Sequence, residues 1–218
     1  MHQGTVYQWA TVGWDRSIEA AVEHIVRVDP VFQRVVQAVG PFDPRRPDGD
    51  SFNTLARSIV FQQLAGAAAR AIYGRFIALY DGHATAEAVL RTPMEQLRAV
   101  GLSGSKAASV VDLAAKTSDG TVPLDHLDEL PDAEIVRRLS AVRGIGRWTA
   151  QMFLNFHLRR LDVWPADDHG VRKGFAVIHA LPAPPAPKAF EALGAIYRPY
   201  RSVAAWYCWR AVDTVLPT

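Results

Sequence analysis

Apolar residues recur at helical spacing along nearly the whole chain. A clear example is the stripe formed by Ile18, Ala21, Val22, Ile25 and Val26, which fits one face of a helix. Convincing segments that alternate apolar and polar residues are absent, and no repeat of fixed period is found. The pattern therefore predicts an all-α fold built from about ten short helices.

Proline and glycine divide this pattern into separate helices. Gly40 and Pro41 end a helix predicted over 31–39, and the loop 41–50 contains three prolines. Residues 52–80 predict either one long helix or two stacked ones. Further helices are expected over 85–90, 103–116, 131–139, 147–158, 168–180, 187–197 and 200–215.

The composition is that of an average globular protein and excludes several classes. The 218 residues are 49% hydrophobic and 21% charged, which argues against a disordered chain. No run approaches the length of a membrane span, and the first residues lack the layout of a signal peptide. The single cysteine, Cys208, excludes an internal disulfide and a four-cysteine iron–sulfur or zinc site. We therefore expect a cytoplasmic protein without membrane contact and without a resident cofactor.

The charges are distributed unevenly. Residues 1–136 hold 12 basic and 17 acidic residues, whereas residues 137–218 hold 12 basic and 5 acidic ones. A basic C-terminal part is typical of a protein that contacts a polyanion mainly from one side. A solvated, arginine-rich surface is the alternative explanation.

Residues 139–150, LSAVRGIGRWTA, predict a tight turn between two helices. Gly144 and Gly146 allow the backbone to turn sharply, and a second helix is predicted to begin at Arg147. Backbone N–H groups at such a helix start suit an anionic phosphate. A helix–helix turn without a ligand is the alternative.

A second motif follows the turn. Residues 161–168 read LDVWPADD, so that Asp167 and Asp168 lie at the start of the helix predicted from His169. Capping of that helix is one role for these carboxylates. The combination of a hairpin, an intervening helix and Pro-x-Asp-Asp resembles the helix–hairpin–helix superfamily of DNA glycosylases. The segments GIGRWTA, PADD and RPYRS, with the tryptophan that follows, are most similar to the 3-methyladenine DNA glycosylase II family, over roughly residues 50–215.

The resemblance implies two helical subdomains that flank an active-site cleft. Residues 1–218 are expected to form a single glycosylase unit, with the hairpin at 139–150 and the catalytic loop at 161–168. The residues before the resemblance are predicted to be helical. No separate N-terminal α/β domain is therefore expected.

The resemblance also assigns the catalytic residue and the base pocket. Asp168 falls on the catalytic position of the family, and Asp167 is expected to cap the following helix. Trp148 occupies the position where glycosylases that also cut the backbone carry a lysine, which implies a monofunctional enzyme. Trp148 and Trp209 are expected to line the base pocket, with core packing the alternative for Trp209. His169 and Gly170 stand where bulkier residues can occur in the family, and we expect them to widen the cleft.

Residues 61–64 resemble the family's loop that enters the duplex when the base is flipped out. Gln63 falls on the wedge position, and Gln62 is the alternative. Leu64 is expected to turn into the core. Residues 102–106 resemble a second family loop near the DNA.

The hairpin is expected to contact DNA through Gly144, Gly146, Arg143 and Arg147. The resemblance also implies that backbone carbonyls of the hairpin hold a Na⁺ or K⁺ ion between the protein and a DNA phosphate. These carbonyls belong to Ser140, Val142 and Ile145. Additional basic residues that could touch phosphate are Arg172, Lys173 and Arg201.

The implied function is excision of alkylated purines of the 3-methyladenine type from double-stranded DNA. The enzyme would flip the base and hydrolyse its N-glycosidic bond as the first step of base excision repair, and a monomer suffices for this. Two alternatives are a non-catalytic helix–hairpin–helix DNA-binding module and a glycosylase for other lesions. A third is a metal hydrolase built on Asp167, Asp168, His169 and His157, although the histidines lack the usual ligand spacing.

Overall fold

The computed structural model describes residues 8–44 and 49–214, and their regular secondary structure is helical, without a strand in these ranges. The prediction of an all-α fold is confirmed. The chain forms two compact units. We call residues 1–44 with 160–218 the terminal unit, and residues 45–159 the central unit.

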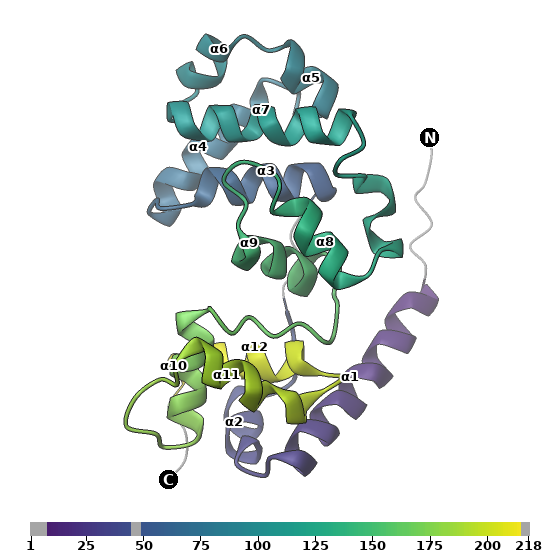
Figure 1. The fold of residues 1–218 in the computed structure, drawn as a ribbon, viewed down its shortest axis with the longest axis vertical. Helices are drawn as coiled ribbons and strands as arrows, with labels where there is room; N and C mark the ends of the chain where they lie inside the picture. Colours follow the sequence, from purple (N-terminus) through teal and green to yellow (C-terminus); the bar gives the residue numbers. More distant parts are fainter. Residues whose placement is uncertain (1–7, 45–48, 215–218) are drawn as a thin grey trace. The chain divides into compact units, whose positions relative to one another are not determined.

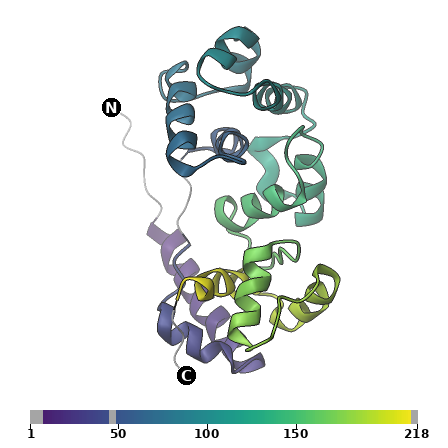
Figure 2. The same ribbon diagram turned by 90° about the vertical axis from the view of Figure 1, so that its left-hand side faces the viewer.

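The terminal unit is built around its last helix. Its elements are α1 (Gln8–Val28), α2 (Phe32–Val39), α10 (His169–Ile178), α11 (Pro187–Leu193), the 3₁₀ turn η3 (Gly194–Tyr197) and α12 (Arg201–Val212). Helix α12 contacts α1, α2 and α10, which can be followed in Figures 1 and 2. These neighbours bury most of the surface of α12 and make it the core helix of this unit.

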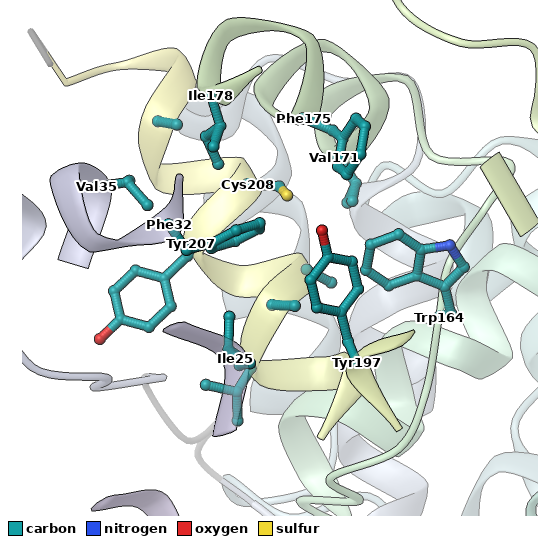
Figure 3. Packing of buried hydrophobic residues seen from close by; sticks show 14 of the residues in the cluster. Ile25, Phe32, Val35, Trp164, Val171, Phe175, Ile178, Tyr197, Tyr207 and Cys208 are labelled. Carbon is teal, nitrogen blue, oxygen red and sulfur yellow. The ribbon is translucent and has the colours of Figure 1, made fainter. Parts of the chain in front are cut away.

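Large aromatic residues surround small residues in this core. Figure 3 shows Trp164 and Tyr197 side by side, in the same cluster as Tyr207 and Cys208, and none of the four is more than 2% exposed. The indole N–H of Trp164 donates to the carbonyl of Phe190 at 2.8 Å, so that its polar atom is satisfied. Helix α12 itself contributes small residues to the core, namely Ala204, Ala205, Cys208 and Ala211.

A buried carboxylate links three parts of the terminal unit. Asp29, in the turn after α1, accepts a hydrogen bond from the hydroxyl of Tyr197 and lies 2.8 Å from Nε2 of His179. The other ring nitrogen of His179 lies 2.9 Å from the carbonyl oxygen of Phe175. The carboxylate is 9% exposed and has hydrogen-bonding partners on two other elements, which is the usual condition for burying such a group.

The central unit is arranged around α7. Its elements are α3 (Ser51–Phe61), α4 (Gly66–Ala78), α5 (Ala86–Arg91), α6 (Met94–Ala99), α7 (Gly104–Ser118), the 3₁₀ segment η1 (Leu124–Glu129), α8 (Asp132–Leu139), α9 (Arg147–Met152) and the π-turn η2 (Phe153–His157). Helix α7 contacts α3, α5 and α6 (Figure 1). Val110 and Leu113 of α7 are fully buried there.

The structure decides two points that the sequence pattern left open. Residues 52–80 form two helices, because α3 ends at Phe61 and α4 begins at Gly66. The helix predicted over 147–158 divides into α9 and a π-turn, a form that often marks functional segments.

Several helices begin with a side-chain cap, which explains where they start. Asp50 accepts the N–H of Asn53 at 2.8 Å at the start of α3. Thr85 accepts the N–H of Ala88 at the start of α5. Ser103 does the same for α7, with the N–H of Lys106 at 3.3 Å. These short polar residues satisfy N–H groups that have no partner within the helix.

Helices α10 and α12 approach each other so closely that Gly174 has no room for a side chain. A Cβ atom placed on Gly174 would lie 1.7 Å from the carbonyl oxygen of Cys208. The Gly174→Ala variant should therefore lose about 3 kcal/mol in its free energy of unfolding, measured by chemical denaturation.

The matched control is Gly74→Ala in α4, where a Cβ would meet no atom within 4 Å. This variant should gain about 0.5 kcal/mol, because alanine is the better helix former. Equal unfolding curves for the two variants would contradict the close packing of α10 on α12.

Candidate functional site

The turn between α8 and α9 has the tight geometry predicted from its glycines. Gly144 has φ +78°, in the left-handed region, and Gly146 is the N-cap of α9 with φ −91°. Val142 and Ile145 are each 2% exposed and anchor the turn in the protein. Gly144 and Gly146 are exposed, so their backbone is open to a ligand.

Helix α7 holds this hairpin in place. The backbone N–H of Arg143 donates to Oδ2 of Asp112 at 2.7 Å, and Lys116 donates to Oδ1 of the same carboxylate. A Cβ on Gly144 would lie 2.8 Å from Oγ of Ser109, which shows how closely the turn packs on the helix.

The pKa of Asp112 reflects these contacts. Burial raises this pKa, but the N–H of Arg143 and the ammonium of Lys116 outweigh burial and hold it below the usual value of 3.8. A carboxyl group with a lowered pKa stabilises the fold above its usual pKa and loses that effect as pH falls through the lower value. The link between α7 and the hairpin is therefore in place at neutral pH.

The two wedge candidates both lie in the α3–α4 loop (residues 62–65), but their surroundings differ. Gln62 donates its side-chain amide to the carbonyl of Gly144 at 2.8 Å, so it is tied to the hairpin. Gln63 is exposed and has φ +54°, an uncommon conformation for a residue with a side chain. Leu64 is 38% exposed, so the expectation that it turns into the core is wrong. Leu64 lies in the loop between the end of α3 at Phe61 and the start of α4 at Gly66, outside the helix faces that pack into the core.

Asp168 is a buried N-cap in the terminal unit. It is 8% exposed, and its Oδ1 accepts the N–H of Val171 at 2.8 Å and the indole N–H of Trp209 at 3.0 Å. Its own N–H donates to the carbonyl of Pro165 at 2.9 Å. Asp167 is exposed and does not cap α10, so the capping role expected of it is wrong. The helix starts one residue later than that role requires.

Gly170 makes room for the contact between Asp168 and Trp209. A Cβ on Gly170 would lie 3.1 Å from Oδ1 of Asp168 and 3.1 Å from Cδ1 of Trp209. Gly170 and Gly174 are four residues apart in α10 and therefore share the face that packs on α12. The two glycines let α12 bring its indole N–H to the carboxylate.

Two of the predicted basic residues have structural partners. Arg201 is bidentate on Asp162, with Nε 2.6 Å from Oδ1 and Nη2 3.1 Å from Oδ2, and its side chain is 13% exposed. It therefore braces the loop 161–168 across a sequence gap of 39 residues. Arg172 donates to the carbonyl of Pro185 at 3.1 Å. The structure leaves Lys173 exposed.

Other predicted site residues lie on the surface of the central unit. Trp148, the second residue of α9, is 47% exposed although its neighbours Thr149 and Ala150 are buried. Arg143 and Arg147 are exposed on either side of the two hairpin glycines. The hairpin thus presents two guanidinium groups and an indole next to an open backbone.

The carbonyls proposed for a monovalent ion lie in the same turn. Ser140 is the C-cap of α8, and the carbonyl of Val142 also accepts the N–H of Ile145 at 3.0 Å. Together with the carbonyl of Ile145, these are neutral oxygen atoms without a carboxylate among them, a type of donor that suits a singly charged cation better than a divalent one.

The described residues offer neither a metal-binding cluster nor a membrane-spanning helix. Residues 17–44 and 49–214 hold no group of three or more His, Cys, Asp or Glu side chains placed to bind a metal. His157, part of the metal-hydrolase alternative, lies 3.1 Å from Oγ of Ser51 and 3.2 Å from Oγ1 of Thr54. Within residues 8–44 and 49–214, each helix is too short or too polar to cross a bilayer.

The sequence places Lys106 in a loop near the DNA without predicting its contacts, and it does not single out Ser109 or Asp112. Lys106, Ser109 and Asp112 lie along one side of α7 and contact the α3–α4 loop or the hairpin. Their spacing of three residues was a signal, but many helix faces show it. The indole N–H of Trp209 was also missed as a partner of Asp168, because 41 residues separate them.

The hairpin glycines are expected to differ in what they tolerate. Gly144→Ala should lower the free energy of unfolding by about 2 kcal/mol, because the methyl meets Ser109 and the left-handed backbone is strained. Gly146→Ala should change it by less than about 0.5 kcal/mol, since its φ is ordinary and its surroundings are open. Thermal and chemical unfolding of both variants measure this difference, and equal destabilisation would contradict it.

Several known proteins are similar in sequence to this chain. The profile of the HhH-GPD superfamily, described as base excision DNA repair proteins, matches residues 56–199. DNA-3-methyladenine glycosylase 1 of Schizosaccharomyces pombe is 35% identical over 199 residues, which cover 89% of this chain and 87% of that protein.

Solved structures give the same result. The S. pombe 3-methyladenine DNA glycosylase Mag1, in complex with abasic DNA, has a TM-score of 0.79 at 34% identity and covers 91% of this chain and 99% of its own. A DNA-3-methyladenine glycosidase of Bacillus halodurans has a TM-score of 0.81 at 31% identity, with 88% of each chain covered. The profile match over most of the chain and the similarity to these proteins show that this protein belongs to the HhH-GPD superfamily of base excision DNA repair proteins.

Proposed function

We propose that this protein is a monofunctional DNA glycosylase that excises alkylated purines of the 3-methyladenine type from double-stranded DNA. Family membership and the relatives that carry 3-methyladenine glycosylase names support this activity. The observation that carries the proposal is the buried Asp168 carboxylate, whose Oδ1 is held by two N–H donors. We take residues 1–218 as one glycosylase unit that acts as a monomer, with the hairpin at 139–150 and the catalytic loop at 161–168.

Asp168 is proposed as the catalytic carboxylate. When the N-glycosidic bond breaks, its electron pair leaves with the purine and the sugar gains positive charge at C1′. A carboxylate fixed near that sugar stabilises the charge and orients a water molecule, whose oxygen then bonds to C1′. The water proton passes to the carboxylate or to solvent, and an abasic site remains.

The residue at position 148 determines whether the DNA backbone is cut after the base is released. A lysine at this position can attack C1′ and form a Schiff base, which leads to cleavage of the DNA backbone. An indole has no such nucleophile, so the reaction stops at the abasic site. Indole faces are also electron-rich, and they attract alkylated purines, which are often cationic. We propose that Trp148 and Trp209 supply these faces.

The hairpin is proposed to bind the DNA backbone. Exposed N–H groups at Gly144 and Gly146 face an approaching phosphate without interference from a Cβ, and Arg143 and Arg147 add positive charge beside them. Carbonyls of the turn would hold a Na⁺ or K⁺ ion, which would link the hairpin to a phosphate. These carbonyls are those of Ser140, Val142 and Ile145.

Gln63 is proposed as the wedge that fills the gap left by the flipped base. Its side chain is exposed, whereas Gln62 is engaged with the hairpin. Leu64, exposed beside it, adds apolar surface for contact with the neighbouring bases.

The first test is release of 3-methyladenine from methylated duplex DNA by the wild type and by Asp168→Asn. An asparagine oxygen can still accept both N–H groups, so the variant should fold normally. It should lose at least about a hundredfold in the rate of base release, because the charge that stabilises the sugar cation is gone.

The matched control is Asp167→Asn, which removes the same charge from an exposed neighbour and should leave the rate unchanged. Base release should also persist in the presence of a chelator, which separates this reaction from that of a metal hydrolase. Equal activity of Asp168→Asn and the wild type would overturn the assignment of the carboxylate. Absence of base release from the wild type, with DNA binding retained, would favour the non-catalytic binding module.

Trp209 is expected to act through its N–H group as well as its ring. Trp209→Phe keeps an aromatic ring but removes the donor to Asp168. It should lower kcat about tenfold, the effect of one hydrogen bond to a charged group, with little change in KM.

Trp206→Phe, the same substitution in the same helix, is the control and should leave kcat unchanged. Trp206 packs on Phe42 with a ring separation of 5.1 Å, and phenylalanine can preserve this contact. If kcat falls by the same factor in Trp209→Phe and Trp206→Phe, the N–H group of Trp209 has no special role and its ring only packs.

A further inference from the structure

Lys106 makes an unusual contact with the loop proposed to enter the duplex. Its ammonium donates to the carbonyls of Val60 and Gln62, at 2.7 Å each. Val60 belongs to the last turn of α3, and Gln62 is the first residue of the α3–α4 loop. Lys106 itself lies in the first turn of α7, so the contact joins two elements 44 residues apart.

The contact has a clear physical basis at the end of α3. The last carbonyls of a helix have no partner within the helix and form the negative end of its dipole. An ammonium placed on them satisfies these acceptors and opposes the dipole. Lys106 therefore caps α3 from outside, at the residue where the loop leaves the helix.

The residue that follows needs such support. Gln63 has φ +54°, which costs energy for a residue with a side chain, and a conformation of this kind persists only where neighbours maintain it. The carbonyl of Gln62, held by Lys106, belongs to the peptide unit directly before Gln63. Fixing this peptide unit fixes the direction in which the chain enters Gln63.

The loop is also tied to the hairpin, and both rest on α7. Gln62 donates to the carbonyl of Gly144, while Asp112 and Ser109 of α7 contact the hairpin directly. Lys106 is one turn away from Ser109 on the same helix. Helix α7 thus sets the spacing between the α3–α4 loop and the hairpin.

We infer that Lys106 is a positioning residue for entry into the duplex: by holding the carbonyls of Val60 and Gln62, it aims Gln63 and Leu64 at the gap left by the flipped base. The inference rests on the proposed glycosylase function. If the inference is right, the effect of losing Lys106 depends on whether the damaged base is paired. Flipping costs most when the base is paired and stacked, and least when it has no partner. Lys106 should therefore matter most for paired lesions.

The test compares Lys106→Met with the wild type on two duplexes that carry N7-methylguanine, opposite cytosine in one and opposite a tetrahydrofuran abasic analogue in the other. Under single-turnover conditions, Lys106→Met should release base about tenfold more slowly from the paired duplex and less than about twofold more slowly from the unpaired one. Lys106→Arg should restore most of the rate, because a guanidinium can donate to both carbonyls.

Lys188→Met is the matched control, since it removes the same charge from an exposed lysine in α11 and should leave both rates unchanged. Thermal unfolding of each variant shows how far a loss of folding contributes. An equal reduction on both duplexes, or no reduction on either, would overturn the inference and leave Lys106 with a structural role or none.

A second measurement does not depend on catalysis. A duplex with the tetrahydrofuran analogue opposite 2-aminopurine reports, through fluorescence, the unstacking that follows when the loop enters. Lys106→Met should give a smaller change than the wild type at saturating protein. If the wild type releases neither 3-methyladenine nor N7-methylguanine but shows the fluorescence change, the proposed activity fails while the role of Lys106 is still tested. If the variant gives the full change, the role of Lys106 fails and the activity is unaffected.

Discussion

The terminal unit depends on the close approach of α10 to α12. Gly174 admits the backbone of Cys208, and Gly170, one turn earlier, leaves room for the indole of Trp209. A side chain at position 174 would push the helices apart, because it would meet backbone atoms at 1.7 Å, whereas one at position 170 would crowd Asp168 and Trp209 at 3.1 Å. At this separation the indole N–H of Trp209 lies 3.0 Å from Oδ1 of Asp168, so the packing of the two helices also sets this hydrogen bond.

In the central unit, α7 supports two segments that lack regular secondary structure, namely the hairpin and the α3–α4 loop. The hairpin contains a left-handed glycine, and the α3–α4 loop contains a left-handed glutamine. Neither segment has a helix or sheet of its own to define it. Both obtain their geometry from α7, through hydrogen bonds to backbone groups that would otherwise lack partners. A rigid helix beneath two exposed loops keeps their spacing constant.

Charged side chains in this protein often support the backbone instead of facing a ligand. Arg201 braces the loop before Asp168, Lys106 caps α3, and Asp112 holds the hairpin. Counting basic residues therefore overstates the cationic surface available to DNA. Arg143 and Arg147 differ from these residues, because both are exposed beside the hairpin glycines.

Patterns along the chain predicted the helical fold, the hairpin and the family, because helical periodicity, the spacing of Gly144 and Gly146, and the Pro-x-Asp-Asp segment are all local. Local patterns could not decide which of two adjacent aspartates caps α10, or that Leu64 is exposed. Those outcomes depend on where a helix starts and what packs above it. The partners of Asp168, Gln62 and Lys106 were decided only by the tertiary structure, since each contact joins residues that are 40 or more positions apart. Hydrogen bonds over such separations leave no periodic signal in one sequence, because they depend on how closely the helices pack.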